Sequence, residues 1–331
     1  MFSRAGRNSA GIAVLLAVVC ILPFIVRPYQ LDFLIFMFIN IILVVSYRLI
    51  AITGEFSLSH AVIMGVGGYA SALLTLHLPI SAWISMPLGG VAAALIAYIL
   101  SFPLFRMKGF YFLIGSFAAA EAIRLCWVQF INPFGGYRGL RQIPVLEIDL
   151  GDFLYIDLGA PVPYYFFALI VGLIFLVIMY RIEHSRFGFV FHAVHHKDML
   201  AQSVGVNARR YRTIAFVTGG FFAGIAGAMV AHYITAINPG LFGLKQMLFI
   251  LVWVLVGGLG SFAGPILGVV VLSIIDESIR GLNELRPAFY GLILIITMLF
   301  LPDGLVSLPD KVMQGVNWLR KREDGDAPNR E

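Results

Sequence analysis

The sequence is poor in charged residues and in cysteine. Of 331 residues, 60% are hydrophobic and 12% are charged, whereas about 25% charged is usual for a soluble domain. This balance predicts a polytopic membrane protein. Cys20 and Cys126 both lie in apolar runs, so they predict neither a disulfide framework nor a metal site. His192, His195 and His196 have no carboxylate or thiolate that completes a ligand set, so no metal is expected there either.

The motifs of several enzyme classes are missing as well. The sequence contains no Gly-x-x-x-x-Gly-Lys-[Ser/Thr], no His-Glu-x-x-His and no Gly-x-Ser-x-Gly. The chain is therefore not expected to hydrolyse ATP or to act as a membrane hydrolase. Acidic residues inside the apolar runs are too few and scattered for a proton relay. Three alternatives stay open: a self-sufficient facilitator or ion-coupled carrier, a subunit driven by a separate motor, and a membrane scaffold.

Apolar runs that are long enough, or nearly long enough, to cross a bilayer fill the chain. They cover residues 10–26, 31–52, 61–78, 82–105, 110–131, 163–180, 213–235, 244–256, 263–279 and 288–301. The pattern predicts an all-α polytopic membrane protein with about ten transmembrane or partly spanning helices. Because run 244–256 is short, eight full spans plus partial ones is the alternative. The runs form one domain, 1–301, and a tail follows at 302–331.

Basic residues predict how the chain is oriented. They gather at residues 4–7, 106–108, 181–212 and 320–322. An even number of crossings places all four segments on one side, which the positive-inside rule identifies as the cytoplasm. Both termini and the tail are therefore expected there. Segment 132–162 is then the one sizeable external loop, either a solvated connection or a landing surface for a soluble protein.

The cytoplasmic loop 181–212 has a pattern typical of a docking helix. If its middle is a single helix, the apolar residues fall on one face and the polar ones opposite. The apolar face comprises Val190, Ala193, Val194, Leu200, Ala201 and Val204. An amphipathic helix between two spans is suited to bind a cytoplasmic partner.

Two glycine-rich segments, 54–61 and 257–265, interrupt the apolar pattern. The interval from Gly54 to Gly65 equals that from Gly257 to Gly268, which indicates two pseudo-repeated halves. Paired interruptions point to the pathway of a transporter, although tight helix packing explains them equally well. The predicted pathway residues are Glu55, Ser57, Ser59, His60, Gly65, Glu121, Gly258, Gly260 and Gly264.

Ionisable groups inside apolar runs require compensation, because each costs about 2.5–3.5 kcal/mol on insertion scales. Glu121 and Arg124 are three residues apart on one helix face and can neutralise each other. The pair is either structural or a substrate contact. Arg48 lies near the cytoplasmic end of its run and is expected to snorkel to the interface.

Four segments, taken in order, resemble the permease subunits of bacterial branched-chain amino acid ABC importers, specifically the LivM-type branch. Residues 54–61 followed by Gly65 are similar to the family's Gly-Gln-Val-Ser-Leu-Gly-His-Ala stretch. Residues 111–144, with Glu121-Ala-Ile-Arg124, resemble its fifth span and external loop. Residues 185–212 resemble the cytoplasmic coupling loop, and residues 257–268 the glycine signature near the end.

The resemblance implies a complex in the bacterial inner membrane. It would contain a second permease, most simply a paralogue, two ATP-binding-cassette ATPase subunits and a periplasmic substrate-binding protein. This chain would bind no cofactor, and ATP and Mg would be used by the ATPase subunits. The complex would import branched-chain or related small amino acids by alternating access.

The resemblance also implies that segment 189–206 is a coupling helix seated in an ATPase subunit. Its coupling residues would be Val194, Asp198, Ala201, Gly205 and Val206. The sequence departs from the family pattern where Glu55 replaces Gln, Phe134 replaces Thr and His195-His196 replaces an Arg-acid pair. The substrate therefore stays open among branched-chain amino acids, other amino acids, urea, amides and small acids.

Overall fold

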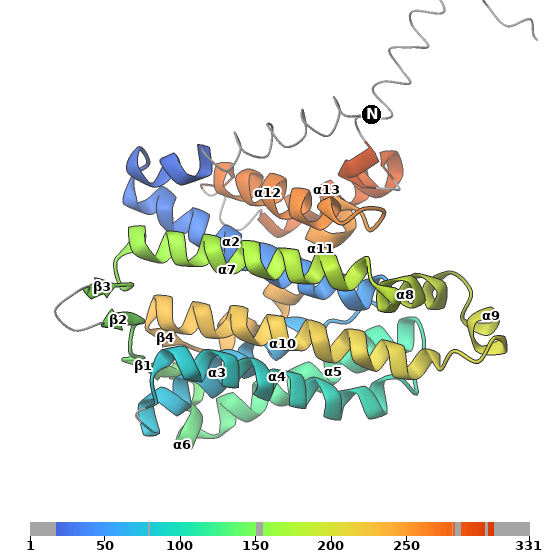
Figure 1. Ribbon diagram of the computed structural model, residues 1–331, viewed down its shortest axis with the longest axis horizontal. Coiled ribbons are helices and arrows are strands. Elements are labelled where there is room, and N and C mark those ends of the chain that lie inside the picture. Colours follow the sequence, from blue (N-terminus) through green and yellow to red (C-terminus); the bar gives the residue numbers. More distant parts are fainter. Residues whose placement is uncertain are drawn as a thin grey trace, which may run out of the picture.

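The structure is a computed structural model that describes residues 18–78, 80–149, 155–279, 281, 286–301 and 304–307. Its long helices lie side by side, and the two ends of the bundle differ (Figure 1). Helices α8 (Arg186–His196) and α9 (Asp198–Ser203) lie at one end, which we call the basic end. Strands β1 (Leu140–Arg141), β2 (Glu147–Asp149) and β3 (Tyr155–Asp157) lie at the other, the strand end.

The helices of the bundle follow the apolar runs closely. They are α2 (Pro28–Ala51), α3 (His60–His77), α4 (Ala82–Leu104), α5 (Phe110–Gln129), α7 (Pro161–Glu183), α10 (Ala208–Ile234), α11 (Leu244–Gly257), α12 (Ala263–Ser278) and α13 (Arg286–Phe300). Apolar segments become helices because the bilayer offers no water to satisfy backbone N–H and C=O groups. Of the first predicted run, only residues 18–26 are described, with the short helix η1 at Leu22–Phe24. The tail beyond residue 307 lies outside the described residues.

Six segments in the described part of the chain are long and apolar enough to cross a membrane: α2, α4, α5, α7, α10 and the segment Pro239–Gly257. The last joins the short helix η4 (Pro239–Phe242) to α11. Helices α3, α12 and α13 are shorter, with 18, 16 and 15 residues. The predicted all-α polytopic class is confirmed.

The core forms where α10 packs between α3 and α4. These helices approach closely at glycines, as small residues permit in membrane bundles. A Cβ atom on Gly67 of α3 would lie 2.2 Å from the carbonyl oxygen of Gly224 on α10. A Cβ on Gly227 would lie 1.9 Å from the carbonyl oxygen of Met64. A side chain at either position would push the helices apart.

The predicted external loop holds short structure that the sequence analysis did not foresee. Helix α6 (Ile131–Phe134) and the turn η2 (Gly136–Arg138) precede β1. Strand β1 pairs antiparallel with β4 (Ala236–Ile237), and β2 pairs antiparallel with β3. The indole Nε1 of Trp83 donates a hydrogen bond to the Glu147 carbonyl at 2.7 Å. These contacts join the loop to the strand-end tips of α4 and α10.

The loop between α7 and α10 is two helices rather than one, so the predicted single amphipathic helix is wrong. Lys197 separates α8 from α9 with an extended backbone, φ −150° and ψ 78°. The break lets Val194 and Ala201 pack together with Ala208 in a small buried core of the loop itself. The predicted apolar face is therefore divided: Val194 and Ala201 are buried, whereas Leu200 and Val204 are exposed together with Phe187, Phe189 and Met199.

Both glycine-rich interruptions lie at the basic end. The first joins α2 to α3 and the second joins α11 to α12. Helix α3 starts at His60 and α12 starts at Ala263, so each helix begins at the same interval after its opening glycine, Gly54 or Gly257. The two connections differ in length, however, because Gly54 follows the end of α2 at Ala51 whereas Gly257 is itself the last residue of α11. The pseudo-repeat of whole halves stays a prediction.

Candidate functional site

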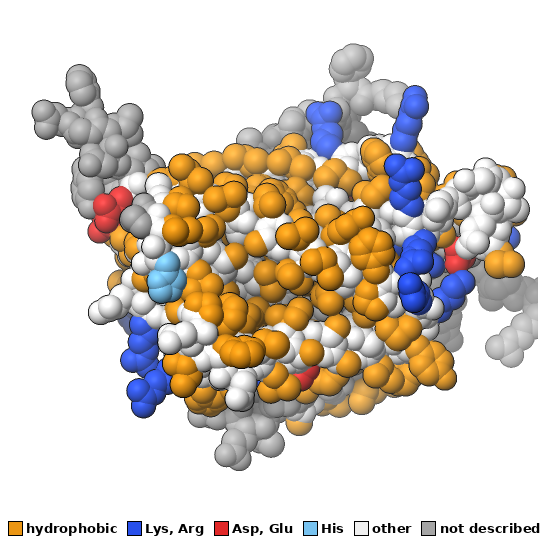
Figure 2. Space-filling view, turned by 90° about the horizontal axis from the view of Figure 1, so that it is seen from below, with side chains coloured by type: hydrophobic (Ala, Val, Ile, Leu, Met, Phe, Trp, Pro, Cys, Tyr) orange, Lys and Arg blue, Asp and Glu red, His pale blue; other side chains and the backbone are white. Residues whose placement is uncertain are grey.

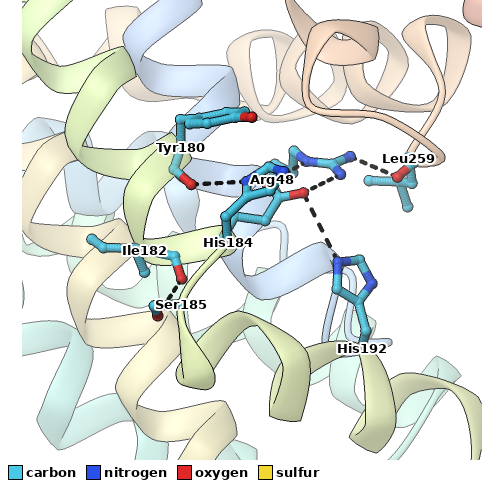
Figure 3. Close-up of polar contacts among 8 residues, drawn as sticks. Arg48, Tyr180, Ile182, His184, Ser185, His192 and Leu259 are labelled. Atoms are coloured by element: carbon cyan, nitrogen blue, oxygen red, sulfur yellow. Dashed lines mark hydrogen bonds and ion pairs between the residues drawn. The ribbon is translucent and has the colours of Figure 1, made fainter. Parts of the chain in front are cut away.

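A buried arginine joins three separate elements at the basic end. Arg48, in the last turn of α2, binds Glu183 at the end of α7 through two hydrogen bonds. Its Nε lies 2.9 Å from Glu183 Oε2 and its Nη2 lies 2.6 Å from Oε1. The remaining nitrogen, Nη1, donates to the carbonyl of Leu259 at 2.7 Å. Figure 3 shows Arg48 reaching Leu259, with His192 on the other side of the ion pair.

This contact, which we call the arginine clasp, is almost closed to solvent. The side chains of Arg48 and Glu183 are 1% and 6% exposed. The prediction that Arg48 snorkels to the interface is therefore wrong, because Glu183 neutralises it inside the protein. Bidentate pairing of a guanidinium with a carboxylate fixes direction as well as distance. The clasp therefore connects three segments: the end of α2, the end of α7, and the α11–α12 turn.

Glu183 was not identified as a site residue from the sequence. It lies where a long apolar run meets a basic loop. An isolated acidic residue at such a boundary could have indicated a buried ion pair with a basic residue elsewhere in the chain. His192 of α8 adds a further group, with its Nε2 at 3.9 Å from Glu183 Oε1. Helix α8 therefore lies close to the carboxylate that binds Arg48.

A second set of charged side chains holds the other side of the loop. Asp198, the first residue of α9, lies 3.3 Å from Lys108 Nζ and 3.6 Å from Arg212 Nη1. Arg212 Nε in turn lies 3.4 Å from Glu55 Oε1. Beside this network is a cavity of 490 Å³ lined by Lys108, Asp198, Gln202, Gly205, Val206, Asn207 and Arg212, among others.

The pKa values of the two acids, Glu55 and Asp198, are shifted in opposite directions, although burial alone raises both. Burial raises the pKa of Glu55 above its ordinary value, and the nearby Arg212 offsets this only in part. For Asp198, burial acts in the same upward direction, but the Gln202 hydrogen bond and the charges of Arg212 and Lys108 hold the pKa below its ordinary value. Glu55 is 4% exposed and its Oε2 has no hydrogen-bond partner among the described residues.

The predicted pathway residues do not gather in one place. Ser57 and Ser59 are buried at the basic end and share a hydrogen bond of 2.8 Å. His60 is buried beside them, and its Nε2 lies 2.9 Å from Ser46 Oγ. Gly65 lies deeper, where a Cβ would come within 2.7 Å of the Phe242 and Trp127 rings. These four residues follow one another along the chain as it runs from the basic end into the core.

The second glycine segment is explained largely by close packing. A Cβ on Gly264 would lie 2.0 Å from the Gly258 carbonyl oxygen. Gly258 itself has φ +94°, a left-handed conformation that glycine adopts without strain. Gly260 has no other group within 4 Å of its Cβ position. The segment shapes the turn whose Leu259 carbonyl receives Arg48.

The predicted coupling residues divide into buried and open positions. Val194 and Ala201 belong to the core of the loop, and Val206 packs against them. Asp198 is in the charged network. Gly205 has φ +86° and no group within 4 Å of its Cβ position, so a side chain there would meet backbone strain rather than a neighbour.

Helix α5 carries charge on an open face between the ends of the bundle. It is the least buried of the six candidate spans. Its exposed stripe is Tyr111, Ile114, Ala118, Ala122, Leu125 and Gln129. Glu121 and Arg124 border this stripe with side chains 28% and 23% exposed, and they form the predicted ion pair. One of its two hydrogen bonds runs from Arg124 Nε to Glu121 Oε2 at 2.8 Å.

The start of α11 lies next to this ion pair. Arg124 Cδ lies 4.0 Å from the Cβ position of Gly243, the residue before α11. Two residues further on, Lys245 is exposed and its Nζ lies 5.5 Å from the Phe249 ring centroid. We call the exposed stripe of α5 together with Glu121, Arg124 and Lys245 the α5 face.

The outer surface supports a membrane location for the bundle. Hydrophobic side chains cover the face in Figure 2 between the two ends. Lys and Arg gather mainly at the basic end, and a smaller group lies at the strand end. In the part of the chain that the structure describes, no group of three or more His, Cys, Asp and Glu side chains could hold a metal ion. The site is therefore built from ion pairs, glycines and apolar surfaces.

We predict that Arg48→Met destabilises the protein far more than Lys108→Met. Removing one partner of a buried pair leaves the other charge uncompensated, at a cost of about 3–5 kcal/mol. Lys108 is 70% exposed in its pair with Asp198, and such pairs contribute about 0–1 kcal/mol. Thermal unfolding of both variants in detergent measures the difference. Equal midpoint shifts would show that the clasp does not hold the basic end.

Comparison with known proteins places this architecture in a family. The family described as "Branched-chain amino acid transport system / permease component" matches residues 29–301. The permease protein LivM of the high-affinity branched-chain amino acid transport system of Escherichia coli K12 is 26% identical over 320 residues, which cover 91% of this chain and 75% of LivM.

Two further relatives match about half of the chain. The high-affinity branched-chain amino acid transport system permease protein LivH of E. coli K12 is 27% identical over 144 residues, which cover 43% of this chain and 46% of LivH. The probable ABC transporter permease protein YphD of E. coli K12 is 30% identical over 166 residues, which cover 47% and 49%. No solved structure matches. Since the family match spans most of the chain and includes every long helix, the protein belongs to the permease components of branched-chain amino acid transport systems.

Proposed function

We propose that this chain is the permease subunit of an ABC importer that moves branched-chain or related small amino acids into the cytoplasm by alternating access. The match to LivM across 91% of the chain carries this proposal. The partners we propose are a second permease, two ATPase subunits that use ATP and Mg, and a periplasmic binding protein. The similarity to both LivM and LivH supports a paired permease.

The arrangement of charge supports an orientation in the inner membrane. Arg181, Arg186, Lys197, Arg209, Arg210 and Arg212 all belong to the α7–α10 connection or its flanking turns at the basic end. The positive-inside rule assigns that end to the cytoplasm. Helix α13 and the short helix η6 (Leu305–Ser307) return the chain to the basic end, since Gly304 lies against Gly258. We therefore propose that the tail and the N-terminus are cytoplasmic.

The α8–α9 loop is the proposed attachment point for an ATPase subunit. Met199, Leu200 and Val204 are 80%, 59% and 75% exposed, an apolar group at the outermost part of the basic end. Behind them, the loop is anchored by the clasp at Glu183 and by the network at Asp198. A subunit that binds the exposed group would therefore move α2, α10 and the α11–α12 turn with the loop.

The α5 face is the proposed lining of the pathway, opposite the second permease. Glu121 lies about 17 Å along α5 from Phe110 at a rise of 1.5 Å per residue, close to the middle of a bilayer core of about 30 Å. Charged groups that face lipid at this depth are strongly disfavoured. A water-filled pathway at a subunit interface satisfies them. Glu55, Ser57, Ser59 and His60 then lie at its cytoplasmic end.

We predict that this chain alone, reconstituted in liposomes, carries no leucine across the membrane, because it has no energy source of its own. The complete transporter should carry leucine into vesicles only when ATP is present on the ATPase side. Radiolabelled uptake distinguishes the two samples. Flux through the isolated chain would favour a self-sufficient facilitator or ion-coupled carrier of small polar solutes.

We predict that Met199→Glu combined with Val204→Glu lowers ATP-driven uptake at least tenfold. The carboxylates would be placed against the apolar contact with the ATPase subunit, while nothing in this chain covers either side chain. Thermal unfolding of the variant should therefore match the wild type, and ATPase subunits should copurify less. Leu78→Glu is the matched control, because Leu78 is 58% exposed at the strand end and lies outside segment 132–162. Normal uptake and normal copurification in the double variant would refute the attachment point.

We predict that the α5 face is in contact with water in the assembled transporter. In a Cys20→Ser, Cys126→Ser background, Leu125→Cys should react with a charged methanethiosulfonate reagent. Ile174→Cys on α7 is the control, since Ile174 and Leu125 are each 50% exposed in the isolated chain. The control should react only with a membrane-permeant maleimide. Equal, slow reaction of both positions with the charged reagent would place the α5 face against lipid.

A further inference from the structure

The Glu121–Arg124 pair is more exposed to solvent than the arginine clasp. Both are bidentate, but the clasp is closed to solvent whereas the α5 pair is 23% and 28% exposed. A guanidinium has five N–H donors and a carboxylate about four acceptor positions. Two hydrogen bonds within the pair therefore use less than half of its capacity. The pair is neutral by itself and still presents both charges outward.

We propose that Glu121 and Arg124 form the subsite that holds the charged end of a transported amino acid during its passage. This inference rests on the proposed function. An amino acid at neutral pH is a zwitterion, with an ammonium and a carboxylate on one carbon. Arg124 binds the substrate carboxylate with its planar fork, and Glu121 accepts hydrogen bonds from the ammonium. One ion pair inside the protein is exchanged for two contacts with the substrate, and the net charge of the site does not change.

The exchange offsets the cost of removing a charged substrate from water, a cost that an uncharged substrate does not incur. A zwitterion at the middle of the membrane loses hydration, and opposite charges at matching positions compensate that loss. In the empty state the two side chains neutralise each other, so no unpaired charge is left at this depth. Competition between the internal pair and the substrate also keeps binding weak, as transit through a pathway requires. Urea or an amide carries no charge and would not need this pair.

The surroundings of the pair fit the other end of a branched-chain substrate. Ile114, Ala118, Ala122 and Leu125 lie along the exposed stripe beside Glu121. They offer apolar surface to an aliphatic side chain, and the two alanines leave room for branching. The α5 face therefore combines a dipolar contact with an apolar one, which is the pattern of leucine, isoleucine and valine.

The test uses the complete transporter in proteoliposomes with leucine as the probe. Glu121→Gln and Arg124→Gln should each lower leucine uptake at least tenfold, while the complex still assembles and the loaded binding protein still stimulates ATP hydrolysis. Glu121→Asp and Arg124→Lys should recover part of the uptake, because they keep the charges. The control is Asp32→Asn, which neutralises a partly buried carboxylate on α2. Its uptake should stay within twofold of the wild type.

A second readout does not depend on turnover. Leucine at millimolar concentration should slow the reaction of Leu125→Cys with the charged thiol reagent when Glu121 and Arg124 are intact. Protection should disappear in Glu121→Gln and in Arg124→Gln. A structural pair would behave differently, with lost assembly in both variants and no protection by leucine even when the pair is intact, and that result would overturn the subsite.

The results also distinguish a failure of the subsite from a failure of the proposed function. If the wild-type complex shows no ATP-dependent leucine uptake, the proposed function fails. If the wild type imports leucine and both neutral variants import it equally well, the proposed function stands and the subsite is refuted.

Discussion

The buried contact of Arg48 with Glu183 and the Leu259 carbonyl is the constraint on which the basic end depends. Its three hydrogen bonds lie between 2.6 and 2.9 Å and connect segments that are far apart in the sequence. A guanidinium is stable at this depth only when its charge is neutralised and its donors are satisfied. The same contact holds the end of α7 and the α11–α12 turn against α2.

This constraint gives the loop a mechanical connection to the membrane helices. The exposed apolar group on α9 is separated from the clasp by α8, and Asp198 links α9 to Arg212 at the start of α10. Helix α10 packs against α3 and α4 through glycines, so displacement of its end is transmitted to the core. Helix α5 contacts α3 and α4 of that core. A subunit acting on the loop can therefore alter the surroundings of Glu121 and Arg124 without contacting them.

Local sequence patterns correctly predicted the helices and contacts that depend on residues close together in the chain. The run 31–52 became α2, Pro28–Ala51, and the spacing of Glu121 and Arg124 predicted their ion pair, because hydropathy and helix geometry act over a few residues. Arg48 was misassigned because its partner, Glu183, is 135 positions away. The break at Lys197 carries no glycine or proline signal, so one helix was predicted where two exist. The family and its permease function were predicted correctly, since four ordered motifs span most of the chain.

The most direct test of the central claim is a distance measured during the transport cycle. Spin labels at Phe189→Cys on α8 and Leu267→Cys on α12, both exposed positions, report on the helices that follow two segments joined by the clasp, the end of α7 and the α11–α12 turn. If the loop, α2 and the α11–α12 turn move as one body, pulsed electron resonance should give the same distance in the complete transporter before and after ATP is added. A distance that changes with ATP would show that the loop moves independently, which contradicts a mechanical role for the clasp.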